Sequence, residues 1–228
     1  MPQLNPHHAI LLFSGGQDST TCLYWALGRF EKVYALIIGY AQRHRVEMDQ
    51  AQRIAARAGT PVQIMDSDLG KYFARNALTD TTQEVEDEIG SEQALPSTFV
   101  PGRNLMFLTL AGMYAWGAGA GSIVLGVNQA DYAGYPDCRE PFIESAQRTL
   151  GLALDQPIQL HTPLMHKTKA EIWQMAQRLG CLEVVIHDSH SCYRGDRGHK
   201  HAWGYGCGSC SACQLRARGY HEAFSTTS

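Results

Sequence analysis

Short apolar runs alternate with longer segments of helical periodicity along this chain. Five runs predict β-strands: HAILLF (8–13), VYALIIGY (33–40), PVQIM (61–65), SIVLGV (122–127) and IQLHTPL (158–164). The first four are almost continuously apolar, as strands are when helices cover both faces of a parallel sheet. The alternation therefore predicts an α/β fold built from βαβ units.

Three segments between these runs predict helices. Residues 45–59 and 169–180 place apolar side chains on one face, and each segment ends at a glycine, a common residue just past a helix. Residues 104–121 are apolar nearly all round, which predicts a helix inside the core. The acidic, aperiodic stretch 79–100 predicts a solvated loop, with a lid over an active site as the alternative.

Length, charge and hydropathy narrow the class of protein. With 228 residues, the chain is long enough for one well-buried domain and a small appendage. A formal net charge of -3 gives no basic footprint, so we expect no direct nucleic-acid partner. The absence of a long apolar run predicts a cytoplasmic protein without signal peptide or membrane span. Its seven cysteines are then expected to be reduced rather than disulfide-bonded.

The first apolar run leads directly into SGGQDST (14–20), where a helical pattern begins. Glycines allow consecutive N–H groups to converge on an anion, and a helix N-terminus adds unpaired donors and a positive dipole end. The hydroxyl groups add further donors, although the Lys of a Walker A loop is missing. The pattern predicts a phosphate site. A plain turn, with Asp18 or Ser19 capping the helix, is the structural alternative.

The segment FSGGQDST (13–20) resembles the pyrophosphate loop of the ATP pyrophosphatases, which include NAD synthetase, GMP synthetase and tRNA-thiolating enzymes. The resemblance implies a doubly wound, Rossmann-like parallel sheet whose loop holds the pyrophosphate of ATP. It also implies that AMP is transferred to an oxygen before a nitrogen or sulfur nucleophile displaces it. By this resemblance the ATP-binding residues of the loop are Phe13, Ser14, Gly15, Gly16, Gln17, Asp18, Ser19 and Thr20.

A cysteine cluster lies near the C-terminus. CGSCSAC (207–213) places three thiols on one tight turn, and a fourth cysteine lies upstream in the segment SCY. Four thiolates suit Zn²⁺ in a closed tetrahedral site. We therefore predict one structural zinc ion held by Cys192, Cys207, Cys210 and Cys213. An iron–sulfur cluster, free thiols, and ligation by His199 or His201 are the alternatives.

The other three cysteines have no place in this cluster. Cys22 and Cys181 are expected to be small core residues, and Cys138 lies in a polar loop where its thiol could be reactive. The cysteine cluster also suggests a division of the chain. We expect an ATP pyrophosphatase domain over residues 1–185 and a zinc-binding segment over 186–228 packed on it.

Five further segments occur in one order: YAQRHRVEMD (40–49), FVPGRNLMFL (99–108), GVNQADYAGYPDCREPF (126–142), TPLMHKTKAEIW (162–173) and SCY with CGSCSAC (191–213). Together with the loop, they resemble the 7-cyano-7-deazaguanine synthases of the queuosine pathway over nearly the whole chain. The resemblance implies an ATP-dependent ligase that adenylates 7-carboxy-7-deazaguanine and captures it with ammonia as the amide. A second adenylation then leaves the nitrile preQ0, with release of AMP and pyrophosphate.

The same resemblance assigns the remaining site residues. The catalytic candidates are Ser14, Asp18, Ser19 and Lys169, and Arg103 is expected to contact ATP. The substrate candidates are Tyr40, Gln42, Arg43, Asn104, Asp131, Tyr135 and Asp137. Mg²⁺ is expected on the triphosphate, and a homodimer is implied. The plain alternatives are a surface arginine at 103, surface lysines at 167 and 169, and a solvated turn over 131–137.

Two features depart from the family pattern. Gly39 stands where that pattern has an aspartate, and the loop between Cys192 and Cys207 is longer than usual. If the missing carboxylate holds ammonium, the reaction ends at an amide, and a peptide or protein amine becomes the alternative acceptor. A tRNA-modifying enzyme would need a basic surface, and a zinc-ribbon interaction module would leave the N-terminal loop unexplained.

Overall fold

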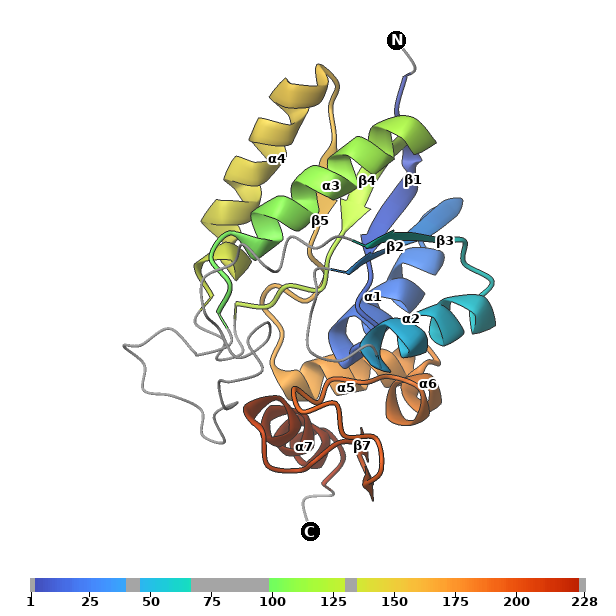
Figure 1. Cartoon of the computed structure of the whole chain (residues 1–228), viewed down its shortest axis with the longest axis vertical. Helices are drawn as coiled ribbons and strands as arrows, with labels where there is room; N and C mark the ends of the chain where they lie inside the picture. The colour runs from blue at the N-terminus through green and yellow to red at the C-terminus, as the bar shows by residue number, and fades with distance from the viewer. Residues whose placement is uncertain (1–2, 40–45, 67–98, 130–134, 226–228) are drawn as a thin grey trace.

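The computed structural model describes residues 3–39, 46–66, 99–129 and 135–225. A five-stranded sheet forms its centre, with the strands parallel and in the order β3-β2-β1-β4-β5 (Figure 1). The strands are β1 (Asn5–Leu12), β2 (Lys32–Gly39), β3 (Val62–Asp66), β4 (Ala120–Val124) and β5 (Gln159–His161). Each overlaps one of the five predicted runs, so the doubly wound α/β prediction is confirmed.

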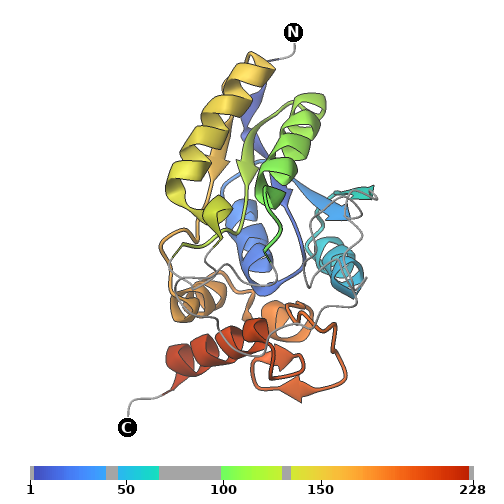
Figure 2. The same cartoon turned by 60° about the vertical axis from the view of Figure 1, so that its left-hand side comes forward.

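Helices cover both faces of the sheet and its carboxyl end. They are α1 (Gln17–Leu27), α2 (Val46–Arg57), α3 (Arg103–Ala118), α4 (Glu140–Leu154), α5 (Lys169–Arg178), α6 (Leu182–His187) and α7 (Ser211–Phe224). A 3-10 turn, η2 (Pro136–Cys138), precedes α4. Figures 1 and 2 show α3 and α4 together on one face of the sheet, with α5, α6 and α7 beyond the carboxyl ends of the strands.

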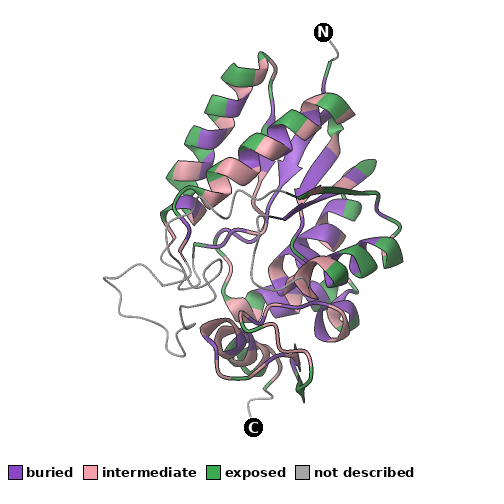
Figure 3. Ribbon diagram, viewed as in Figure 1, coloured by how far each residue is buried: buried purple, intermediate pink, exposed green. Residues whose placement is uncertain are grey.

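The core has two layers because successive strand residues point to opposite faces. In β1, Ala9 and Leu11 pack with buried residues of α1 and α2, whereas Ile10 packs with those of α3 and α4. The inner strands β1, β2 and β4 are therefore mostly buried on both faces, as the purple sheet in Figure 3 shows, whereas the edge strand β3 is largely exposed. This double burial is the reason that the strand sequences are continuously apolar rather than alternating.

Helix α3 corrects the prediction of a fully buried segment. Its inner face is buried at Leu108, Ala111 and Ala115, but its outer face leaves Leu105 47% and Met113 64% exposed. The helix is thus part of a surface layer, with apolar residues on both its inner and outer faces. The predicted loop over 79–100 lies almost entirely outside the described residues.

The C-terminal segment packs against the end of the α/β core. Helix α7 runs along α5, and a side chain at Gly219 would lie only 2.6 Å from Cβ and Cγ of Lys169. The longer loop noted in the sequence contains a short hairpin, β6 (Lys200–His201) and β7 (Gly204–Tyr205), with Trp203 buried beneath it. Trp173 of α5 and Trp203 of the C-terminal segment belong to the same apolar core, so side chains pack across residue 185. The division of the chain at that residue stays a prediction.

Within the described ranges, no helix has both the length and the hydropathy required to cross a membrane.

Candidate active site

The sheet order creates a crevice beside β1. The chain continues from β1 to β2 and β3 on one side, whereas β4 and β5 lie on the other, so the segments that follow β1 and β4 diverge. Open α/β sheets bind ligands at such a switch point. A cavity of about 390 Å³ opens here, bounded by Leu12 and Phe13 at the end of β1 and by residues 36–38 and 125–128.

The loop after β1 forms one wall of this cavity and has the backbone that an anion site requires. Gly15 has a φ of +78°, and a Cβ there would lie 2.7 Å from the backbone nitrogen of Ala51. No other residue fits that position without strain. Helix α1 begins at Gln17, with Gly16 as its N-cap and no side-chain cap. The alternative in which Asp18 or Ser19 caps the helix is therefore wrong.

Two loop hydroxyls converge in the cavity. Ser14 Oγ and Ser19 Oγ lie 3.1 Å apart, and both residues line the cavity. Of the predicted ATP-binding residues, Phe13, Gly16, Gln17 and Asp18 also line it. Gly15 and Thr20 do not, since Gly15 shapes the turn and Thr20 is completely buried. The loop thus presents hydroxyls and helix-terminal amides to one space.

Lys169 reaches the loop from the other end of the chain. Its Nζ donates to both carboxylate oxygens of Asp18, at 2.9 and 3.1 Å, and both residues line the cavity. A capping box fixes this position, because Thr168 Oγ accepts from the Glu171 N–H while the Glu171 carboxylate accepts from the Thr168 N–H. Lys167 lies before the helix and does not line the cavity, so only Lys169 takes the predicted place.

The start of α3 contributes a second group of predicted residues. Arg103, Asn104 and Tyr135 line the cavity, and the Arg103 guanidinium lies 5.7 Å from the centre of the Tyr135 ring. Asp137 has a different role in this structure. It is buried outside the cavity lining, and its carboxylate accepts from the Asn104 N–H at 2.9 Å, which stabilises the first turn of α3.

Several cavity residues were not identified from the sequence, namely Glu47, Met48, Phe107, Cys138, Ser191, Tyr193 and Arg216. The segments YAQRHRVEMD, FVPGRNLMFL, YPDC and SCY contain all of them except Arg216, but the residue types alone gave no sign of which side chains face the cavity. Burial raises the pKa of the Cys138 thiol to about 11, which disfavours the thiolate form that a reactive cysteine requires. Four predicted substrate residues, Tyr40, Gln42, Arg43 and Asp131, lie outside the described residues.

Glu47 is the acidic residue with the largest pKa shift in the described part of the cavity. Burial raises its pKa from an ordinary 4.5 to about 7, although the Arg103 guanidinium opposes this shift. Between these two values, the unfolded chain has lost the Glu47 proton while the folded chain retains it. The folding stability contributed by this group therefore falls as pH rises from 4.5 to 7 and stays low above pH 7.

We expect Glu47→Gln to raise the melting temperature relative to the unaltered chain at pH 8 and to have much less effect at pH 5, because glutamine carries no charge to desolvate. Thermal unfolding in a pH series measures this. Asp49→Asn, an exposed change in the same turn of α2, is the control for removing a carboxylate from this helix. If Glu47→Gln changed the melting temperature equally at pH 5 and pH 8, the raised pKa of Glu47 would be contradicted.

The four C-terminal cysteines form a cluster. Each of their sulfur atoms lies within 4.8 Å of the others, and Cys207 Sγ is 3.9 Å from Cys213 Sγ. Four thiolates bound tetrahedrally at about 2.3 Å from one ion lie roughly 3.8 Å apart. Backbone N–H groups of Cys207 and Cys210 point to the sulfurs of Cys192 and Cys207. The donor set and spacing fit a closed metal site, as predicted.

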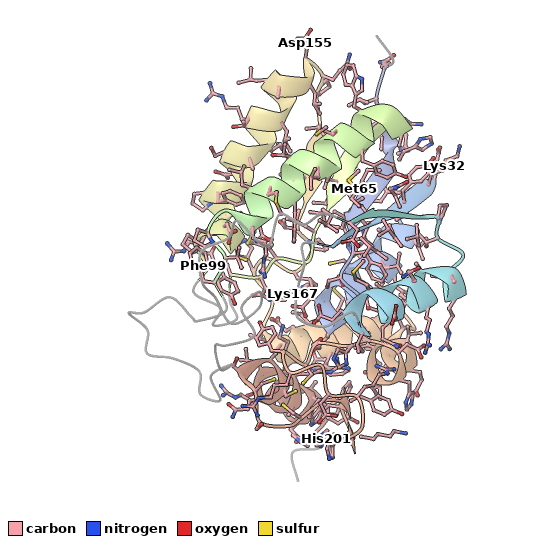
Figure 4. All side chains as sticks on the ribbon, in the orientation of Figure 1. Lys32, Met65, Phe99, Asp155, Lys167 and His201 are labelled. Atoms are coloured by element: carbon pink, nitrogen blue, oxygen red, sulfur yellow. The ribbon has the colours of Figure 1, made fainter. Side chains whose placement is uncertain are left out.

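The two histidines considered as ligands have other partners. His201 Nε2 lies 2.9 Å from the Gly206 carbonyl oxygen, and its ring stacks on Trp203 (Figure 4 labels His201). His199 Nδ1 lies 2.6 Å from the Asp196 carboxylate. Neither belongs to the cluster among the described residues, so four sulfurs remain as the ligand set.

Gly39, which stands where the family pattern has an aspartate, lies beside the carboxylate of another strand. Gly39 at the end of β2 pairs in register with Asp66 at the end of β3. A Cβ at Gly39 would lie 2.5 Å from Asp66 Oδ1. The space for a side chain at 39 is therefore filled by the carboxylate of Asp66. The neighbouring strand therefore ends in a carboxylate close to position 39, although Asp66 itself is exposed and does not line the cavity.

Comparison with known proteins agrees with this geometry. A 7-cyano-7-deazaguanine synthase from Wolinella succinogenes is 44% identical over 96% of this chain and 94% of the relative, and one from Phocaeicola vulgatus is 48% identical over 96% and 95%. A 4-thiouridine synthetase solved with RNA and ATP shares the fold, with a TM-score of 0.52 and 18% identity over 95% of this chain and 50% of that one. The family model described as queuosine biosynthesis protein QueC matches residues 8–224, and the chain belongs to that family.

Proposed function

We propose that this chain is an ATP-dependent ligase that converts 7-carboxy-7-deazaguanine and ammonia, through the amide, into 7-cyano-7-deazaguanine. One observation carries the proposal most directly. The Asp18–Lys169 pair and the hydroxyls of Ser14 and Ser19 lie on one wall of a cavity at the switch point of the sheet. The relatives named as synthases match almost the full chain and do not favour the alternatives of an amide-forming variant or a tRNA-modifying enzyme.

In this proposal the loop after β1 binds the β- and γ-phosphates of ATP. Backbone amides at the start of α1, together with Ser14 and Ser19, donate to the phosphate oxygens. Lys169 stabilises the charge that develops on pyrophosphate as it leaves, and Asp18 orients that ammonium. Mg²⁺, bound with the nucleotide, would neutralise phosphate charge, and the Asp18 carboxylate is the ligand type it prefers.

The deazaguanine is proposed to bind at the α3 end of the cavity. Arg103 can pair with its carboxylate, and the Tyr135 ring offers a face for stacking. Asn104 has its backbone N–H and its side-chain amide occupied by Asp137 and Cys138, which leaves its carbonyl oxygen to accept an N–H of the base.

The chemistry requires two activations of one oxygen. A carboxylate oxygen attacks the α-phosphorus, pyrophosphate leaves, and ammonia then displaces AMP to form the amide while a proton is released. The amide oxygen attacks a second ATP in the same way, and loss of AMP with two protons leaves the nitrile. Glu47, whose raised pKa is about 7, has the proton affinity that a group accepting these protons needs near neutral pH.

We further propose that the cysteine cluster binds one zinc ion. Four thiolates leave no coordination position open, which is typical of a structural rather than a catalytic zinc site. Hydrogen bonds from the thiols of Cys210 and Cys213 lower the pKa of Cys192, which favours the thiolate form that a metal ion binds. The ion would then hold α7 and the β6–β7 hairpin together.

A homodimer is also proposed, with the outer face of α3 as the contact. Leu105 and Met113 of α3 and Leu152 of α4 are large apolar side chains with high exposure, a feature typical of association surfaces. Sedimentation velocity at micromolar concentration distinguishes a dimer from a monomer.

The identity of the organic product tests the proposed function. The full chain is incubated with ATP, Mg²⁺, 7-carboxy-7-deazaguanine and ammonium, and the product is identified by mass. We expect the nitrile, because the Asp66 carboxylate lies close to the position of the acid that Gly39 lacks. Accumulation of the amide without nitrile would contradict the proposal and would favour the alternative in which the reaction ends at the amide.

A further inference from the structure

Ser191 connects the cysteine cluster to the phosphate loop. It directly precedes Cys192 in the chain, and its Oγ accepts a hydrogen bond of 3.1 Å from the backbone N–H of Gln17, the first residue of α1. The adjacent His190 N–H donates to the Gly15 carbonyl at 3.0 Å. Two consecutive residues of this segment therefore hold both sides of the glycine pair. A Cβ at Gly16 would lie 3.3 Å from Ser191 Oγ, so the contact is close.

Arg216 holds Ser191 from the opposite side. Its guanidinium is buried and donates to the carbonyls of Val185 and Trp203, at 2.7 and 2.9 Å, and to Ser191 Oγ at 3.3 Å. Burial lowers its pKa to about 10, so the group stays positively charged at neutral pH. Arg216 lies one turn after Cys213 on α7 and also lines the cavity. This cation thus lies between the thiolates and the phosphate site.

The hydroxyl oxygen of Ser191 accepts two hydrogen bonds, which leaves its proton available to donate. A hydroxyl oxygen accepts at most two hydrogen bonds and donates one. The Gln17 N–H and the Arg216 guanidinium occupy both acceptor positions, and no acceptor for the proton is found among the described residues. Ser191 is half-buried and lines the same cavity as Ser14 and Ser19. Its proton therefore has an acceptor when an anion enters the cavity.

We propose that Ser191 is a further phosphate-binding residue, which donates its hydroxyl proton to a phosphate of the bound nucleotide and fixes the loop to the metal-bound cysteine cluster. Metal loading then orders the loop through Cys192 and Ser191, and through Cys213 and Arg216. This inference rests on the proposed function, because it takes the bound anion to be the triphosphate of ATP or the pyrophosphate product.

Binding of inorganic pyrophosphate and of ATP, each with Mg²⁺, to the metal-loaded full chain tests the proposal by titration calorimetry. Ser191→Ala removes a hydrogen bond to a charged group, so we expect the Kd for both ligands to rise roughly 10-fold to 100-fold with metal content unchanged. Ser191→Thr retains the hydroxyl and should restore most of the affinity. Ser209→Ala is the matched control, since Ser209 also precedes a cysteine ligand but contacts Cys207 Sγ and Arg194 instead of the loop.

The outcomes separate the two proposals. If the unaltered chain binds neither ligand, the proposed function fails. If it binds both, and fully loaded Ser191→Ala binds them with unchanged Kd, the role of Ser191 is overturned. Should Ser191→Ala lose its metal, hydrogen exchange of residues 14–19 in the unaltered chain decides. Metal removal is expected to speed exchange there while β4 stays protected, and unchanged exchange in the loop would overturn the coupling.

Discussion

Asp18→Asn is expected to reduce kcat/KM for AMP release by about 100-fold or more, which is the cost of removing a charged group that acts on the transition state. The amide cannot ligate Mg²⁺ as a carboxylate does, and it leaves Lys169 without the negative charge that orients its ammonium. The fold should persist, because Asp18 is exposed to the cavity and caps no helix. Chromatographic measurement of AMP and pyrophosphate gives the rate.

Asp188→Asn is the matched control for this change. Asp188 also pairs with a cation, Arg57, at 2.6 Å, but both groups are partly exposed on the surface away from the cavity. Pairs of this kind contribute little to stability. The control should retain the activity and the melting temperature of the unaltered chain. Equal activities for Asp18→Asn and Asp188→Asn would show that the Asp18–Lys169 pair has no role in the reaction.

Cys210→Ser is expected to lower bound metal far below one ion per chain and to cost about 4 kcal/mol or more of stability, because structural metal binding contributes directly to folding. That loss corresponds to a decrease of roughly 10 °C in melting temperature for a domain of this size. Cys210 is completely buried and is the N-cap of α7. Loss of the ion would loosen α7, including Gly219 where it packs on Lys169.

Metal analysis and thermal unfolding measure this effect, with Cys181→Ala as the control. Cys181 is equally buried and belongs to the same core, but its sulfur is not part of the cluster. The control should keep one ion per chain despite a cost from the cavity it creates. Full metal content in Cys210→Ser would show that the cluster is not the metal site.

The sheet and the cysteine cluster could be predicted because each follows from local pattern. Strands buried on both faces have continuous apolar sequences, and the cysteine spacing of 207–213 brings three thiols together in one turn. Helix α4 was not predicted, although its sequence carries an apolar stripe that buries Ile143, Ala146 and Leu150. The exposed face of α3 was missed because periodicity does not show which side an apolar helix turns to the core.

Local pattern alone predicted the site only where the chemistry lies in consecutive residues, whereas Lys169, Arg103 and Tyr135 were assigned by the family resemblance. The loop around Ser14 can be identified from its own sequence. Lys169 is 151 residues away from Asp18 in the chain, and the fold determines that Lys169 rather than Lys167 contacts this carboxylate. Asp137 illustrates the opposite case, in which an acid beside the site stabilises a helix instead. Ser191 had no signal of its own, because its role depends on contacts with two distant segments.

The nucleotide products test the central claim, that the loop after β1 binds ATP for cleavage between the α- and β-phosphates. Phosphorus NMR of a reaction with ATP, Mg²⁺, 7-carboxy-7-deazaguanine and ammonium follows every phosphate species at once. We expect AMP and pyrophosphate in equal amounts, and neither product when the deazaguanine is left out. Formation of ADP and inorganic phosphate would contradict this claim.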